Sequence, residues 1–162
     1  MLLNRKETTA LLSELTEKLI NPQKDVRIYS AKEVTFDYGT QNQVRVDYMR
    51  FKPLNNTVSG IEKGDFYCYE IKSSVEDFNS KNGHNMIGDY NYYVMPATVY
   101  ENVKNKIPYR TGVYVFNPLL YQNKLISVKK AKRSDRKKSA LEMLLMMFRS
   151  ANRQLNKGLK ER

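Results

Sequence analysis

The chain has 162 residues, one cysteine, one histidine, no tryptophan and 12 tyrosines, and its formal net charge is +11. This length fits a single domain, and a hydrophobic content of 41% argues against a wholly disordered basic protein. The lone Cys68 excludes an intramolecular disulfide and a cysteine zinc cage. Because no apolar run approaches the roughly 18 residues of a membrane span and no signal-like segment opens the chain, we expect a cytoplasmic protein.

The positive charge is concentrated near the C-terminus. Residues 1–120 carry 15 Lys and Arg against 14 Asp and Glu, whereas residues 121–162 carry 13 against 3. A one-sided basic surface indicates a polyanionic partner, either nucleic acid or an anionic membrane surface. Because the polar flank of the last helix is not wholly cationic, we expect no membrane attachment. The alternative is a solvated basic helix without a partner.

Hydrophobic periodicity and turn residues predict the elements in chain order. A first helix is expected over residues 3–20, where leucines recur at steps of three and four until Asn21-Pro22 ends it. Valine, isoleucine and tyrosine predict extended structure from 26 to 36, and strict alternation predicts a strand over 43–51. The next segments are predicted to be a loop over 52–64, a strand over 65–72, and a helix beginning within 73–78 and capped by Ser73 or Ser74.

The second half of the chain predicts short strands and one long helix. Strands are expected over 91–95, 111–116 and 124–128, with a brief helix over 98–106. The last helix is expected over about 134–157, capped by Ser134. Its core face is predicted to be a helical stripe with methionines packed around it, and the alternative is a methionine surface that binds a partner; the stripe is Leu141, Leu144, Leu145, Phe148, Ala151 and Leu155.

This order of elements predicts an α/β fold. We expect one domain over residues 1–162, built on a small mixed sheet that is flanked by helices. The sequence shows no internal repeat and no linker that would divide it.

Carboxylates and lysines are the catalytic groups that the sequence offers. The chain has no glycine-rich phosphate loop, and His84 alone forms neither a histidine metal site nor a Ser-His-Asp triad. Asp47 lies on one predicted strand, and Glu70 and Lys72 share one side of the next because strand side chains alternate. Two such carboxylates can bind Mg²⁺, and a nearby lysine can orient a metal-bound water and stabilise a phosphate. The alternative is a cross-strand ion pair.

The arrangement of these residues resembles the PD-(D/E)XK nuclease superfamily. The resemblance is carried by a helix, a strand, Arg45-Val46-Asp47, then Tyr69-Glu70-Ile71-Lys72-Ser73-Ser74 and a helix. Val46 stands where the superfamily has its proline. More narrowly, residues 70–78, 89–96 and 107–113 are similar to MmcB-like DNA-repair proteins and their phage relatives. The resemblance covers about residues 32–132 and implies a restriction-endonuclease-like fold with an αβββαβ core and a four-stranded mixed sheet.

The resemblance implies a metal-dependent nuclease that hydrolyses phosphodiester bonds of DNA in repair or in a mobile element. Asp47 and Glu70 would bind Mg²⁺ or Mn²⁺, Ile71 would add its backbone carbonyl, and Lys72 would be the motif lysine. Whether further polar residues join the site is open; these are Glu14, Glu33 and His84. The alternative function is that of a catalytically inactive nuclease-fold protein that binds nucleic acid or counters a host defence system.

A basic cluster lies between the last predicted strand and the last helix. Such a cluster can neutralise backbone phosphates without reading sequence, and we expect DNA as its partner; its members are Lys129, Lys130, Lys132, Arg133, Arg136, Lys137 and Lys138. Tyr90, Tyr92 and Tyr93 either stack on bases or belong to the sheet. A homodimer or a partner protein is also compatible with the sequence.

Overall fold

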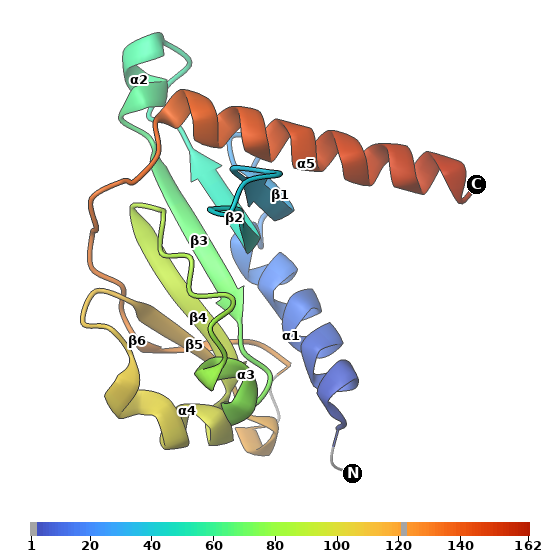
Figure 1. Cartoon of the computed structure of the whole chain (residues 1–162), viewed down its shortest axis with the longest axis vertical. Coiled ribbons are helices and arrows are strands. Elements are labelled where there is room, and N and C mark those ends of the chain that lie inside the picture. Colours follow the sequence, from blue (N-terminus) through green and yellow to red (C-terminus); the bar gives the residue numbers. More distant parts are fainter. Residues whose placement is uncertain (1–2, 121–122) are drawn as a thin grey trace.

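The computed structural model describes residues 3–120 and 123–162 and has one six-stranded mixed sheet at its centre (Figure 1). The strands lie side by side in chain order: β1 (Tyr29–Phe36), β2 (Val44–Lys52), β3 (Asp65–Ile71), β4 (Tyr90–Pro96), β5 (Gly112–Phe116) and β6 (Ile126–Lys129). The β3–β4 and β4–β5 pairs are parallel, and the other three pairs are antiparallel. The predicted α/β class, with a mixed sheet flanked by helices, is confirmed.

The number of strands agrees with the residue pattern of the sequence and not with the number that the resemblance implies. All six predicted extended segments form strands, whereas a four-stranded sheet is wrong for this chain. The first strand begins at Tyr29 rather than near Val26, because the Asp25 carboxylate accepts hydrogen bonds from the backbone and guanidinium of Arg27 and holds a turn there. A short helix, α2 (Val58–Glu62), occupies part of the predicted loop.

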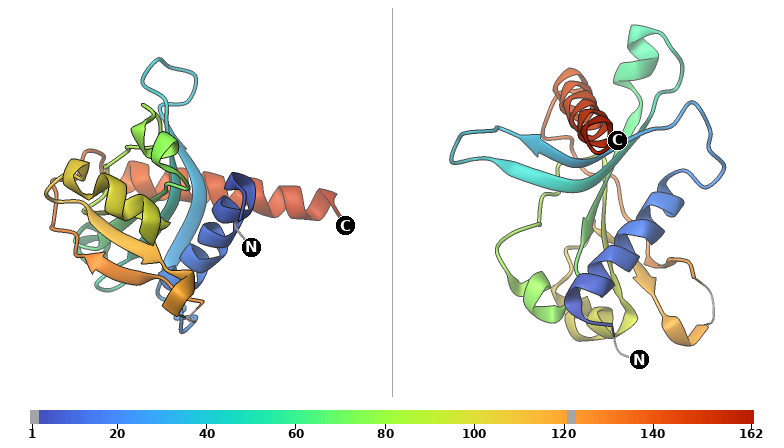
Figure 2. Two further views of the ribbon diagram at one scale, coloured as in Figure 1. Left: turned by 90° about the horizontal axis from the view of Figure 1, so that it is seen from below. Right: turned by 90° about the vertical axis from the view of Figure 1, so that its right-hand side faces the viewer.

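Helices cover both faces of the sheet. Helix α1 (Arg5–Ile20) begins with a capping box between Asn4 and Glu7 and buries its leucines against Tyr69 and Val94. Helices α3 (Val75–Asn79) and α4 (Ala97–Val103) pack with Tyr93 on the opposite face, because neighbouring side chains of β4 alternate. The views in Figure 2 show this arrangement. Two 3-10 turns, Lys104–Lys106 and Pro118–Leu120, follow α4 and β5.

Helix α5 (Ala140–Lys160) begins later than the sequence predicts. Ser139 caps it through the backbone N–H of Glu142, and Ser134 does not. Residues 130–139, here called the strap, run from β6 at one edge of the sheet to α5, which packs on β1 at the other edge (Figure 1). The strap is not helical because its N–H groups bond to distant carbonyls, as Ser134 does to Asp89 at 2.8 Å.

The buried face of α5 is also not the predicted one. Met143, Met147 and Ser150 are buried, whereas most of the predicted stripe is exposed. The Ser150 hydroxyl donates to the carbonyl of Lys32, next to Glu33, whose φ is 52°. This polar contact and the two methionines fix which side of the helix meets the sheet. Within the described residues, the helices include none with the length and apolarity needed to cross a membrane.

One buried carboxylate fixes the strap to the sheet. Asp89 is 2% exposed, and its Oδ2 accepts hydrogen bonds from the backbone N–H of Phe66 at 2.8 Å and from Arg136 Nη2 at 3.0 Å. Arg136 also donates to the carbonyl of Gly64, and Arg133 lies within 3.5 Å of Asp89. The two arginines therefore neutralise a charge that would otherwise be buried alone.

We expect Arg136→Ala to lower the free energy of unfolding by about 3 kcal/mol, because Asp89 then loses its most buried cation. Lys137→Ala is the matched control, since Lys137 is the exposed neighbour on the same strap, and it should change stability by no more than about 0.5 kcal/mol. Urea unfolding followed by circular dichroism measures both values. Equal effects of the two substitutions would contradict this role for Arg136.

Candidate active site

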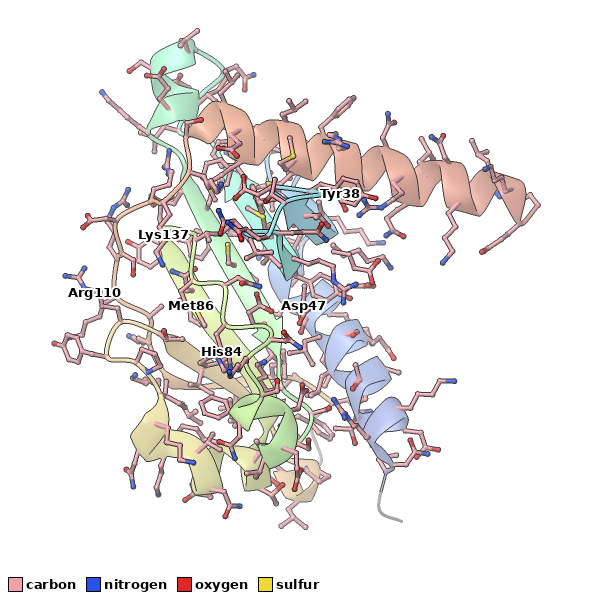
Figure 3. All side chains as sticks on the ribbon, viewed as in Figure 1. Tyr38, Asp47, His84, Met86, Arg110 and Lys137 are labelled. Carbon is pink, nitrogen blue, oxygen red and sulfur yellow. The ribbon has the colours of Figure 1, made fainter. Side chains whose placement is uncertain are left out.

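The predicted residues Asp47, Glu70 and Lys72 meet at one end of the β2–β3 pair. The ladder pairs Tyr48 with Tyr69, so the next position in the same register brings Asp47 opposite Glu70. Directly opposed residues of an antiparallel pair have their Cβ atoms about 5 Å apart. Figure 3 labels Asp47 beside this end of β3. Two carboxylates in such a position repel each other unless a proton or a cation lies between them.

Asp47 is half-buried and lies in the wall of a cleft. Its Oδ2 accepts a hydrogen bond from the backbone N–H of Ile71 at 2.9 Å. Burial raises the pKa of this carboxyl above its usual range, and the hydrogen bond from Ile71 opposes that rise. In an extended strand the N–H and C=O of one residue point the same way, so the Ile71 carbonyl is directed toward β2 as well.

Glu70 is the most unusual residue of the site. Its side chain is 1% exposed, and in the described part of the chain its Oε1 atom has no hydrogen-bond partner. Burial, together with the charge of Asp47, raises the pKa of Glu70 to about 9, and the charge of Lys72 acts in the opposite direction. The buried carboxyl group therefore holds a proton at neutral pH when no cation is present.

Lys72 is held by backbone carbonyls rather than by a carboxylate. It is 2% exposed, and its Nζ donates to the carbonyls of Asn82 at 2.7 Å and Asp77 at 3.5 Å. Burial lowers its pKa, which the charges of Asp77 and Glu70 oppose. Within the described residues Lys72 makes no ion pair, so the cross-strand ion pair considered from the sequence is not formed.

The loop between α3 and β4 lies against Lys72 and Glu70. Ser74 caps α3, one of the two predicted caps, and this short helix supplies the Asp77 carbonyl that holds Lys72. Gly83 in the loop has a φ of 69°, and a Cβ there would lie 2.7 Å from Lys72 Nζ and 3.5 Å from Glu70 Oε2. A glycine is required here by both the backbone conformation and the lack of space.

The donors of this site suit a hard divalent cation. Two carboxylates and the Ile71 carbonyl are oxygen ligands, and Mg²⁺ characteristically takes a few such ligands while keeping several waters. The Oε1 atom of buried Glu70, which has no partner in residues 3–120 and 123–162, is the atom that a cation would satisfy. Across residues 3–120 and 123–162, no three His, Cys, Asp or Glu side chains converge on a point where they could hold a metal. The residues that fit are thus the predicted set, Asp47, Glu70 and Ile71.

The further candidates from the sequence do not join this set. Glu14 and Glu33 line the same cleft, but Glu14 pairs with Lys18 at 2.6 Å, and Glu33 contacts Arg45 and Gln154. His84 uses both ring nitrogens within the protein, with Nδ1 2.6 Å from the Tyr93 hydroxyl and Nε2 2.8 Å from the Ser80 carbonyl. His84 is therefore part of the support for the loop.

A cleft of about 1150 Å³ leads to the site, and the sequence did not predict its basic residues. They come from elements far apart in the chain: Arg5, Lys32, Arg45, Lys81 and Lys157. The first three lie within 4 Å of an acidic side chain, whereas Lys81 and Lys157 make no ion pair within the described residues. Because five separate segments supply these residues, no local pattern in the sequence could have found them.

Most of the predicted basic cluster makes contacts within the protein. Arg133, Arg136 and Lys138 form ion pairs with Asp65, Asp89 and Asp37 respectively. Lys129 donates to the carbonyl of Pro108, and Lys132 contacts the Tyr109 side chain. Lys130 and Lys137 remain exposed. Figure 3 shows Lys137 on the strap, well apart from Asp47.

The tyrosines and Cys68 belong to the sheet. The ring of Tyr90 stacks on Tyr67 and that of Tyr92 on Tyr69, with centroids 4.9 and 5.4 Å apart, so these ring faces already have partners. Tyr93 is buried, and burial raises its pKa to about 12. Cys68 is also buried.

Comparisons with protein-family models, with curated proteins and with solved structures found no match to this chain. The resemblance to the PD-(D/E)XK superfamily therefore depends on Asp47, Glu70 and Lys72 and on the elements that carry them.

The raised pKa of Glu70 predicts a pH-dependent stability. Because the folded protein keeps this proton up to about pH 9 while the unfolded chain releases it near its ordinary value of 4.5, the free energy of unfolding should fall as the pH rises between these values. The slope from this group is at most about 1.4 kcal/mol per pH unit. Urea unfolding in chelator from pH 5 to 8.5 measures it.

Glu70→Gln should remove this slope, and it should be more stable than the unsubstituted protein at pH 8. Glu76→Gln is the control, because Glu76 is an exposed acid in the first turn of α3. If the unsubstituted protein and Glu70→Gln lose stability equally as the pH rises, the pKa of Glu70 is not raised and the slope has another source.

Proposed function

We propose that this protein is a metal-dependent nuclease of the PD-(D/E)XK type that hydrolyses phosphodiester bonds of DNA. The observation that carries the proposal is the buried Glu70 carboxyl group, of which one oxygen has no hydrogen-bond partner within the described residues. It lies opposite Asp47 and beside Lys72, and these two residues line a cleft together with basic side chains. In the absence of a bound ion, two opposed carboxylates and a desolvated lysine are unfavourable in a fold. In a site that binds a cation and a phosphate, the carboxylates have the cation as their partner and the lysine has the phosphate.

The roles of the residues follow from their contacts. Asp47, Glu70 and the Ile71 carbonyl would hold Mg²⁺, or Mn²⁺ in its place, and the bound ion would activate water and offset charge on the phosphate. The Ile71 N–H orients the Asp47 carboxylate through Oδ2, which leaves Oδ1 for the ion. The carbonyls of Asn82 and Asp77 hold the Lys72 ammonium beside the carboxylates. Its remaining N–H donor stabilises a phosphate oxygen as negative charge develops on it.

The cleft rather than the strap is the better surface for the DNA backbone. Lys81 and Lys157 line the cleft that contains Asp47, and neither is neutralised by an ion pair within the described chain. The strap uses three of its cations to hold itself on the sheet, which leaves fewer charges for phosphates. The predicted cluster from Lys129 to Lys138 therefore becomes the alternative binding surface.

We expect the protein to cleave DNA in Mg²⁺ or Mn²⁺ and to lose at least about 100-fold in rate on Lys72→Ala, because that change removes a preorganised donor to the phosphate. Glu70→Gln and Asp47→Asn should be similarly inactive. The assay uses linear, nicked, branched and single-stranded DNA, and Lys137→Ala, which lies outside the cleft, should retain full activity.

A second measurement tests metal binding independently of DNA cleavage. Mn²⁺ should raise the melting temperature of the unsubstituted protein but not that of Asp47→Asn. If the protein binds DNA and gains stability from Mn²⁺ but cuts none of the four substrates, the inactive nucleic-acid-binding function is correct instead. Cleavage that survives Lys72→Ala would contradict the proposed mechanism.

The cleft also predicts which lysines bind phosphate. Lys81→Ala with Lys157→Ala should weaken DNA binding uniformly across sequences and reduce the slope of log affinity against log salt by about 2, because two phosphate contacts are lost. Lys130→Ala with Lys137→Ala removes the same charge from the strap and should leave the slope nearly unchanged. Fluorescence anisotropy at several salt concentrations measures both, and the opposite ranking would assign binding to the strap.

A further inference from the structure

Helix α5 has a second apolar face that is mostly exposed in the described part of the chain. Leu141 is 82% exposed and Phe148 is 66% exposed, although both are large apolar residues. The exposed apolar residues of the helix are Leu141, Leu145, Phe148, Leu155 and Leu159. Figure 1 shows that the C-terminal half of α5 extends past the sheet. A helix in water without tertiary partners is only marginally stable over so few turns, so this half needs a partner.

The exposed residues follow the spacing of a coiled coil. Positions 141, 145, 148, 152, 155 and 159, here called the seam, are separated alternately by four and three residues. This is the a/d pattern of a heptad repeat, with Leu141, Phe148 and Leu155 at d positions. Asn152 is the polar residue of the seam and occupies an a position, where a single asparagine specifies register and oligomeric state.

The rest of the molecule lies on the other side of the helix. In the same heptad, Met143 and Ser150 occupy f positions and Met147 a c position, which are the positions that face away from the seam. These are the three buried residues of α5, and they contact the β1 side of the sheet. Lys157, at another f position, lines the cleft. A second helix can therefore lie along the seam with the sheet of each copy on the outside.

The polar residues of the seam favour a second copy in parallel orientation. In a parallel pair Asn152 meets Asn152 of the second copy, and the two amides satisfy each other by hydrogen bonding. In an antiparallel pair that aligns the whole seam, Asn152 would instead lie against Phe148, and the e-position residue Arg149 would lie beside its own counterpart. Such a pair places an amide against an apolar ring and brings two like charges together.

We propose that the protein is a homodimer in which α5 pairs in parallel with α5 of a second copy along the seam. The proposal does not depend on the nuclease activity, because the seam and the cleft lie on different faces of α5. In this dimer the two α5 helices form a two-stranded coiled coil whose two-fold axis runs along the helices.

Sedimentation equilibrium of the full chain tests the dimer. The expected mass is twice the 19.0 kDa of one chain. Leu145→Glu with Leu155→Glu should give 19.0 kDa at every concentration, because charges then face each other across the seam. The matched control is Leu54→Glu with Leu119→Glu, two exposed leucines off the helix, which should leave the dimer intact. Since the seam is exposed in one copy, the sheet and α1 should stay folded in both variants. The far-ultraviolet circular dichroism spectrum of the whole chain checks this.

The orientation is tested by Leu159→Cys, which adds one thiol at an a position. Under mild oxidation the parallel dimer should form an intermolecular disulfide, and Cys68 does not compete because it is buried. A protein that stays monomeric at its highest soluble concentration would overturn the proposal, as would a dimer that the seam substitutions leave unchanged. A dimer without the disulfide would overturn the parallel orientation.

Discussion

The placement of two carboxyl groups opposite each other at the end of the β2–β3 ladder is the constraint that organises the centre of this protein. Asp47 and Glu70 are opposed, and Glu70 is buried, with one oxygen that has no partner among the residues the structure describes. Two features of the surrounding chain lower the electrostatic cost of this placement. The Ile71 N–H donates a hydrogen bond to Asp47, and two backbone carbonyls hold the Lys72 ammonium nearby. Gly83 has no side chain, so the backbone of the 80–89 loop can lie close to Lys72 and Glu70. Such an arrangement is maintained at the expense of stability, which is typical of a site that binds something.

Much of this centre could be predicted from the sequence because it is local. Alternation along 65–72 places Glu70 and Lys72 on one side of β3, and Ser74 caps the helix that follows. The neighbouring strand is also clear from its pattern, and with it the position of Asp47. The contacts that hold Lys72 could not be predicted, because they involve backbone carbonyls of a loop whose path depends on Gly83.

The C-terminal quarter could be predicted least, for two physical reasons. The sequence shows its charges but not their partners, and Asp37, Asp65 and Asp89 lie far away in the chain. Helix α5 has apolar residues on two sides, so periodicity alone does not say which side meets the sheet. The face with Met143, Met147 and Ser150 is buried because Ser150 bonds to the carbonyl of Lys32 and the two methionines belong to the core cluster of Val34 and Phe36.

The way the strap joins opposite edges of the sheet has a consequence for how the chain folds. The hydroxyl of Ser150 bonds to a residue 118 positions earlier, so the contact between α5 and β1 closes a loop that contains the other five strands of the sheet. Contacts of such long range form late, because the chain entropy lost in closing the loop is regained only once the intervening strands are in place. During synthesis β1 is made well before α5, which covers it. Until α5 docks, the apolar surface around Val34 and Phe36 lacks its cover, and exposed apolar surface of this kind makes a folding intermediate prone to aggregate.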